Sequence, residues 1–277
     1  MIHGGYKIMG MHFKSWLIDY KIWCSFLLAI GFIVYNLRNY VLFANAFGNG
    51  LQVLELYIAN GNKSNSYIGV VIGCLFMLSD APFTTSRSKY EVLRTGKLTW
   101  VKSQLAYITL SVVIYNILYL LLACIYSCIS CPVGFNNEWS YTFRNLAIQQ
   151  PDLAVWEYKI SFPFPNVILE MNPWLAAVMT LIYNVAYILC LCLVTAVINM
   201  YSNKNFGWLV ASGIHVAGYV AKASSGLTRF RFPFFEYAHF VQWFTDWESV
   251  FIPTITFLII ILSLVYISFK LTANLEV

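Results

Sequence analysis

Two short patterns bring together residue types that can do chemistry. Glu236 and His239 form an ExxH pattern, which places a carboxylate and an imidazole about one helical turn apart, as acid–base catalysis or metal binding requires. A di-metal site in a helical bundle needs a second ExxH and two more carboxylates, and the sequence has no second ExxH. An intramembrane enzyme that acts on lipid headgroups through these two residues is therefore one hypothesis.

Cys128 and Cys131 form the other pattern, a CxxC at the end of an apolar run. Such a pair supplies half of a zinc site or a thiol–disulfide couple, but a second ligand pair is missing. The sequence also lacks an HExxH zinc pattern and a GxxxxGK[ST] phosphate loop. We therefore predict no catalytic residue, no metal site and no cofactor in this chain, which we do not expect to be an enzyme.

A third feature is basic and lies between two apolar segments. Five cations fall within residues 78–104: Arg87, Lys89, Arg94, Lys97 and Lys102. Ser88 and Glu91 have the spacing of a capping box, and Gly96 suits the left-handed residue that follows a helix end. The pattern predicts a helix over 89–95, with Arg94 in the last turn, where the helix dipole favours a cation. An ordinary basic loop bound to anionic lipid headgroups is the alternative.

The composition around these residues is that of a membrane protein. Of the 277 residues, 60% are hydrophobic and only 10% are charged, whereas soluble domains carry roughly 25% charged residues. A helical span needs about 20 apolar residues. We predict a single all-α transmembrane domain over 1–277 with six spans, at about 22–44, 64–80, 103–130, 173–200, 206–222 and 251–270.

Two further segments stay open at this level. Residues 8–20 place several apolar side chains on one broad face, which indicates either an N-terminal interfacial helix or the start of the first span. Residues 45–63 fit an outer loop or a re-entrant piece equally well.

Orientation follows from the placement of Lys and Arg. With six spans, both termini share one side with loops 81–102 and 201–205, and this side holds ten of the seventeen cations but only four of the twelve acids. We predict a multi-pass protein of the bacterial plasma membrane with both termini in the cytoplasm. The loops 131–172 and 223–250, both rich in aromatic residues, then lie outside.

The segment FMLSDAPFTTSRSKYEVLRTGKLTWVKSQ resembles the loop between the second and third spans in bacterial ABC transporter permeases of the second exporter class. In that family a DAPF-like exit precedes a short basic helix, an R-x-G-like stop and a Trp that enters the next span. Arg94, Gly96, Lys97 and Trp100 match this pattern as they stand. The resemblance covers the layout of the whole chain, including the missing nucleotide-binding domain, but has one specific motif.

The resemblance implies that the helix is a coupling helix seated in a groove of a separate ATPase subunit, present in two copies, which binds ATP and magnesium. It also implies a second permease copy, identical or related, and membrane lipid as partners; we expect no nucleic acid. The expected ATPase contacts are Arg87, Ser88, Lys89, Tyr90, Glu91, Leu93, Arg94 and Gly96. The expected junction with the second span is Asp80, Pro82 and Phe83.

The function this implies is export of a hydrophobic or amphipathic substrate such as a peptide, bacteriocin, drug or lipid. Polar residues in apolar spans could mark its path, although they also join helices to one another. These are Ser79, Asn116, Asn184 and Asn199. Residues 64–79, 103–137, 171–203 and 205–221 contain no Asp, Glu, Lys or Arg. His215 lies in the last of these ranges, and we expect it to pack against a neighbouring helix. A receptor or immunity protein that binds a peptide through the aromatic outer loops is the alternative without an ATPase.

Overall fold

Long apolar helices dominate the protein. The computed structural model describes residue 10 and residues 13–14, 16, 18–47, 50–82, 86–149, 151–202, 204–224 and 233–273. Within this part, four helices are long and apolar enough to cross a membrane. They are α2 (Tyr20–Ala46), α6 (Lys97–Ser130), α10 (Pro173–Ser202) and α14 (Phe251–Ala273), the last preceded by the 3-10 turn η1 (Glu248–Val250). These features are those of an all-α membrane protein.

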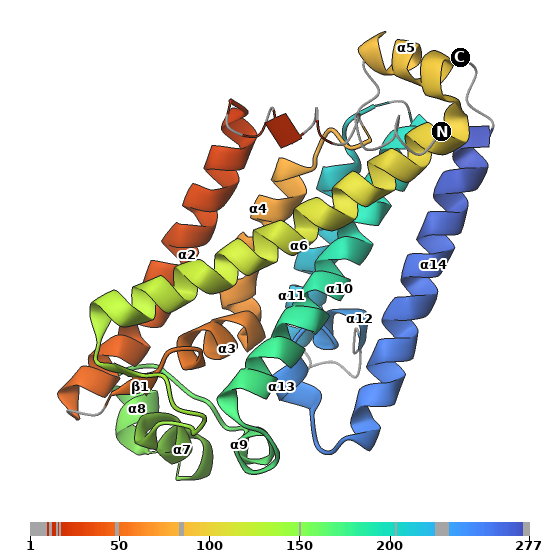
Figure 1. The fold of residues 1–277 in the computed structure, drawn as a ribbon. Coiled ribbons are helices and arrows are strands. Elements are labelled where there is room, and N and C mark those ends of the chain that lie inside the picture. Colours follow the sequence, from red (N-terminus) through yellow and green to blue (C-terminus); the bar gives the residue numbers. More distant parts are fainter. Residues whose placement is uncertain are drawn as a thin grey trace.

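Two shorter helices complete the bundle, α4 (Ser64–Met77) and α11 (Gly207–Ala223). Figure 1 shows them beside α10 in the middle of the molecule, with α2 and α14 on opposite sides and α6 crossing obliquely. Burial follows this arrangement, since 61% of the most apolar window of α10 is buried, against 11% in α14. The central helices therefore pack on protein, while α14 presents most of its apolar surface outward.

Close packing of α4 depends on small residues. The Ser25 hydroxyl of α2 donates to the Gly73 carbonyl of α4 over 2.6 Å. A Cβ atom at Gly73 would lie 2.7 Å from the Tyr115 hydroxyl of α6, closer than real contacts allow. Small residues and interhelical hydrogen bonds join membrane helices in this way, because lipid supplies no hydrophobic force between them.

Helix α2 begins at Tyr20. Asp19 caps it, because its carboxylate accepts the Lys21 N–H over 2.9 Å. Among the described residues of the segment 8–20, Phe13 and Trp16 pack against Tyr107, and the Trp16 indole donates to the Tyr107 hydroxyl over 3.0 Å.

The end of the molecule opposite helix α5 (Ser86–Thr95) is built from short strands and helices. Strand β1 (Leu51–Gln52) pairs in parallel with β2 (Val133–Gly134), followed by α7 (Tyr141–Ile148), α8 (Asp152–Trp156) and α9 (Pro165–Glu170). Helix α3 (Glu55–Asn62) is buried at every residue, which rules out an exposed outer loop over that part of 45–63. Two further short helices, α12 (Pro233–Glu236) and α13 (Phe240–Trp243), lie near α3 and α11.

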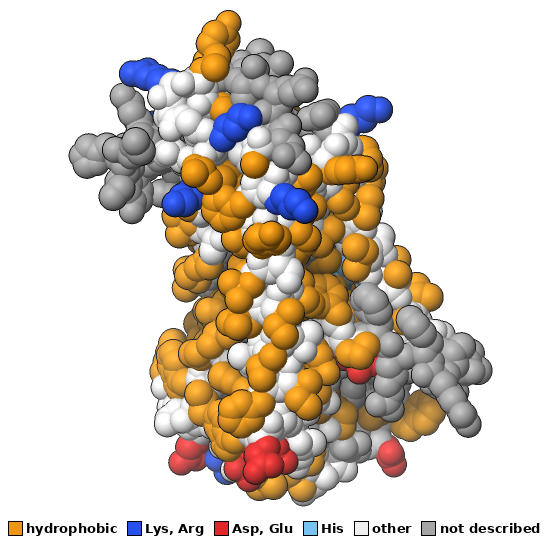
Figure 2. Space-filling view, turned by 90° about the vertical axis from the view of Figure 1, so that its right-hand side faces the viewer, with side chains coloured by type: hydrophobic (Ala, Val, Ile, Leu, Met, Phe, Trp, Pro, Cys, Tyr) orange, Lys and Arg blue, Asp and Glu red, His pale blue; other side chains and the backbone are white. Residues whose placement is uncertain are grey.

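Charge divides the two ends of the bundle. Figure 2 shows Lys and Arg side chains toward the end that carries α5 (Ser86–Thr95), Asp and Glu toward the other end, and a broad hydrophobic zone between them. In Figure 1 the start of α2 and the end of α14 lie at the α5 end. We call this end the basic end and the opposite one the acidic end.

Candidate functional site

The short basic helix is present, but it begins earlier than its capping pattern indicates. Helix α5 starts at Ser86, so Ser88 lies inside the helix, and the prediction that Ser88 caps its N-terminus is wrong. Arg94 is in the last turn, as predicted. Gly96 separates α5 from α6 with φ +83° and ψ 149°, a region that is essentially restricted to glycine. One glycine therefore forms the whole turn between the two helices.

One side of helix α5 packs against the bundle, and another side is exposed. Val92 is buried in a small apolar cluster with Trp100 and Val101 of α6, against which Phe269 of α14 also packs. Tyr90 and Leu93 are 75% and 70% exposed. Exposed apolar side chains that form a patch mark a contact surface for another protein or for the membrane. The side chains of Arg87, Ser88, Lys89 and Glu91, and the whole of Phe83, lie outside the described part of the chain.

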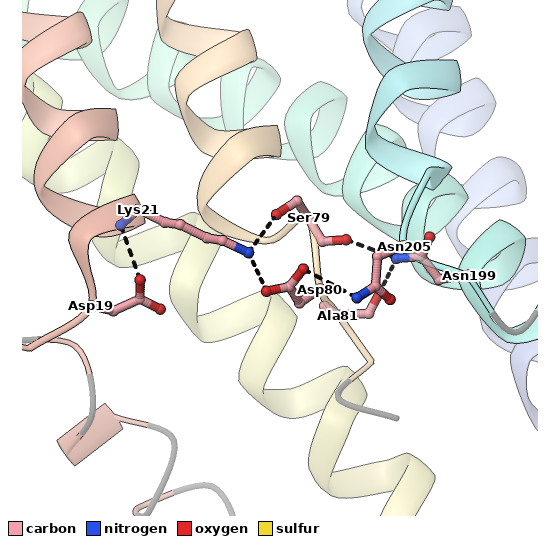
Figure 3. A network of polar contacts seen from close by, with 7 residues as sticks. All are labelled: Asp19, Lys21, Ser79, Asp80, Ala81, Asn199 and Asn205. Atoms are coloured by element: carbon pink, nitrogen blue, oxygen red, sulfur yellow. Dashed lines mark hydrogen bonds and ion pairs between the residues drawn. The ribbon is translucent and has the colours of Figure 1, made fainter. Parts of the chain in front are cut away.

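At the basic end, the side-chain amide of Asn199 joins α10 to the end of α4 and to the start of α11. The Asn199 Nδ2 of α10 donates to the Ser79 and Ala81 carbonyls at the exit of α4, over 2.9 and 2.8 Å. Its Oδ1 accepts the Gly207 N–H at the start of α11 over 2.8 Å. Figure 3 shows this amide between the two chain segments. Asn199 therefore uses its side-chain oxygen and both amide protons to hold the ends of α4 and α11, and it is 1% exposed.

An ion pair extends this contact to α2. Lys21 pairs with Asp80, and its ammonium also donates to the Ser79 hydroxyl over 3.3 Å. Asn205 donates to the other Asp80 oxygen over 3.3 Å (Figure 3). We call this set of five residues, Lys21, Ser79, Asp80, Asn199 and Asn205, the basic-end junction. Asp80 thus lies where the junction was expected, and Pro82, which is buried, follows it.

Of the four residues expected along a substrate path, Ser79 and Asn199 lie together in the basic-end junction, where their hydrogen bonds join chain segments. Asn116 is buried in α6 and donates to the Val112 carbonyl of its own helix. Asn184 is buried in α10 against Gly61 of α3, where a Cβ atom would lie 2.8 Å from its Nδ2.

The interior near α3 is more polar than the sequence suggests. His215 of α11 lies 2.8 Å from the Tyr187 hydroxyl, which agrees with a histidine packed between helices. His239 is fully buried and its Nδ1 lies 3.3 Å from the Gly61 carbonyl of α3. Glu236 is half-buried in α12, and its carboxylate interacts electrostatically with Lys222. No hydrogen bond between the Glu236 and His239 side chains is found among the described residues, so the ExxH pattern forms no acid–base pair there.

No sequence pattern indicates the role of Glu55, the first residue of α3. Its carboxylate accepts the Gln52 N–H over 2.9 Å, the Ser140 N–H over 2.6 Å and the Ser140 hydroxyl over 2.7 Å. Burial raises the pKa of this carboxyl to about 7, although these hydrogen bonds and the nearby Arg144 act in the opposite direction. Glu55 therefore fastens the segment before α7 to α3 at the acidic end.

The remaining chemistry-bearing residues form no cluster. Cys128 is exposed and Cys131 is buried, and both are free thiols. No group of three or more His, Cys, Asp or Glu side chains that could hold a metal occurs in the described part of the chain. Comparison with protein-family models, with curated proteins and with solved structures finds no match to this chain.

Proposed function

We propose that this chain is the membrane-spanning permease subunit of an ATP-driven exporter and that α5 is its contact with a separate ATPase. The observation that carries the proposal is the form of α5. It is a short helix at the basic end, anchored by Val92 and connected to α6 through Gly96 alone, with Tyr90, Leu93 and Arg94 exposed. The two apolar side chains would fill a groove in the partner, and Arg94 would pair with its carboxylates.

The arrangement of the helices supports six spans. The order along Figure 1 alternates between the two ends: α2, then α3 with α4, then α6, α10, α11 with α12 and α13, and finally α14. Helices α4 and α11, with 14 and 17 residues, are shorter than a full span, and short helices adjoin them at the acidic side. The basic end would face the cytoplasm by the positive-inside rule, so both termini and α5 would lie there.

The energy for transport would come from the partner. A transporter of this kind needs two copies of the ATPase, which bind ATP and magnesium, and a second permease, which is either another copy of this chain or a related one. The apolar and aromatic interior favours a hydrophobic or amphipathic substrate, such as a peptide, bacteriocin, drug or lipid. Such a ligand would have to bind the two states of the permease with different affinities for ATP closure to move it.

Co-purification with the ATPase encoded beside the chain tests the proposal. The variant combines Tyr90→Ala with Leu93→Arg, which removes the exposed apolar contact without touching buried Val92. The matched control is Tyr201→Ala, because Tyr201 is 79% exposed at the end of α10 but does not belong to α5. We expect wild type and control to retain the ATPase and the α5 variant to lose it, with the same melting temperature for all three. Wild type that retains no ATPase in several mild detergents would overturn the proposal.

Exposed aromatic side chains at the acidic end favour a second candidate function. Phe135, Tyr141 and Trp156 are exposed there on folded segments, which suits a receptor or immunity protein that binds a peptide from outside. This function needs no ATPase. It would be favoured if a Trp156→Ala variant lost peptide binding while the α5 variant kept it.

A further inference from the structure

A small pocket near the acidic end contains a lysine that forms no ion pair with any residue the structure describes. The pocket has a volume of about 130 Å³ and lies between α2, the break that separates α3 from α4, the segment before α9, and α13. Its lining includes Tyr40, Asn62, Lys63, Ser161, Phe162 and Gln242.

Lys63 is the residue that gives this pocket its chemistry. It occupies the single position between α3 and α4, and its ammonium lies 5.9 Å from the centre of the Tyr40 ring. No carboxylate of the described residues forms an ion pair with it. Burial lowers the pKa of Lys63, so its charged form is disfavoured by the protein alone. A cation in this position gains from an anion that replaces the lost water.

The other residues around the pocket are joined by hydrogen bonds that do not involve the Lys63 side chain. The Asn62 amide donates to the Thr180 hydroxyl and accepts the Val241 N–H, and Gln242 donates to the Asn62 carbonyl. The Tyr40 hydroxyl donates to the Ser161 carbonyl over 2.9 Å and so fixes the opposite wall. None of these bonds uses the Lys63 ammonium, which keeps three protons for a ligand.

One neighbouring feature adds to the positive character of the pocket. Lys63 precedes α4 directly, and the first N–H groups of α4 have no side-chain cap. An anion near Lys63 would therefore meet more than one favourable field.

We propose that this pocket binds the oxyanion headgroup, phosphate or carboxylate, of a membrane amphiphile. The ammonium of Lys63 holds the oxyanion, and the aromatic side chains of Tyr40 and Phe162 contact the first carbons of the apolar body. The small volume accommodates a headgroup and excludes a folded peptide. The position suits such a ligand, because Tyr40 lies in the last third of the apolar helix α2, toward the acidic end. This site does not depend on an ATPase partner.

Lipid binding to the full chain tests the site. Delipidated protein in a neutral maltoside detergent is titrated with phosphatidylglycerol, myristate, diacylglycerol or inorganic phosphate, and bound ligand is counted by native mass spectrometry. We expect phosphatidylglycerol, myristate or both to bind at least tenfold more tightly than diacylglycerol, which lacks the anion, since hydrogen bonds between charged groups are roughly twice as strong as those between neutral groups. Phosphatidylglycerol alone would identify a phosphate, myristate alone a carboxylate, and competition by inorganic phosphate would show that the anion itself suffices.

Variants locate the binding at Lys63. Lys63→Met should weaken binding of the anionic amphiphile about tenfold or more, while Lys63→Arg should retain it. Lys159→Met is the matched control, because it removes the same charge from an exposed lysine at the same end. Equal binding by Lys63→Met and Lys159→Met would overturn the proposal, as would equal binding of diacylglycerol.

A measurement on wild-type protein keeps the test independent of folding in the variants. Acetic anhydride acetylates accessible lysines, and peptide mass spectrometry reports each site. We expect bound anionic amphiphile to slow acetylation of Lys63 at least threefold and to leave Lys159 unchanged. No difference in protection between these two lysines, with anionic amphiphile bound, would refute the site.

Discussion

Replacement of Asn199 by Ala should destabilise the protein through the loss of three buried hydrogen bonds. These bonds, at 2.8, 2.8 and 2.9 Å, join Asn199 to Ser79, Ala81 and Gly207. At about 1 kcal/mol each in soluble proteins, or about 0.6 kcal/mol in a membrane bundle, they contribute roughly 2–3 kcal/mol together. Ala leaves two carbonyls and one N–H without partners, so the upper part of this range is expected.

A second substitution separates the hydrogen bonds from the packing. Asn199→Asp keeps the oxygen that accepts from Gly207 and replaces the amide donor by an oxygen that faces the Ser79 and Ala81 carbonyls. We expect this isosteric change to cost at least as much as Asn199→Ala, because acceptors then face acceptors in a buried site. Loss of packing alone would predict the reverse order.

The assay is reversible unfolding in mixed micelles of dodecyl sulfate and a neutral detergent, followed by tryptophan fluorescence. Asn205→Ala is the matched control, since Asn205 is exposed and makes one bond of 3.3 Å in the same junction. It should change the free energy of unfolding by less than about 0.5 kcal/mol. The reasoning is refuted if Asn199→Ala costs no more than Asn205→Ala.

Three further changes test other parts of the structure. Gly96→Ala should lower the melting temperature, or detach α5 as shown by faster proteolysis within 86–95, because its φ of +83° costs about 1–3 kcal/mol for another residue. Gly207→Ala should destabilise more than Gly96→Ala in thermal unfolding, since its Cβ would lie 2.3 Å from the Thr195 carbonyl. Glu55 has a folded-state pKa raised to about 7 from 4.5, so it favours the folded state fully below pH 4.5 and loses this contribution, about 3 kcal/mol, as the pH rises through 7. Glu55→Gln should flatten the dependence of unfolding free energy on pH over that interval; an unchanged slope would contradict the assignment.

Apolar runs locate the long helices well but not their ends. The predicted segment 173–200 lies within α10 and 251–270 within α14, because continuous apolar composition is what lipid-facing helices need. Helix α6 begins six residues before the predicted 103, at Lys97. Lys97 and Lys102 are helical without being apolar, so hydropathy reports the extent of the apolar zone rather than the extent of the helix.

Helix α3 shows what composition cannot reveal. Its eight residues, ELYIANGN, are buried on all sides by protein rather than lipid, and polar members find partners far along the chain. Asn60 donates to the Tyr119 hydroxyl over 2.6 Å, and Asn62 donates to Thr180 over 3.0 Å. A segment of this kind has no one-sided apolar pattern to detect, because all of its faces are buried. The role of Asn199 is hidden in the same way, since two of its acceptors are 118 and 120 residues away.

The contacts of the two segments that flank α5 differ in strength. This difference determines how a displacement of α5 would be transmitted to the other helices. On one side α5 reaches α6 through Gly96, and its Val92 lies in a small apolar cluster with Trp100 and Val101, against which Phe269 of α14 packs. On the other side the exit of α4 is held to α10 and α11 by Asn199 and to α2 by Lys21. The weaker apolar contact yields before buried hydrogen bonds break, and the glycine permits rotation. Under the proposed function, ATP closure would therefore move α6 and α14 first, and α4 would follow only if the basic-end junction shifts as one unit.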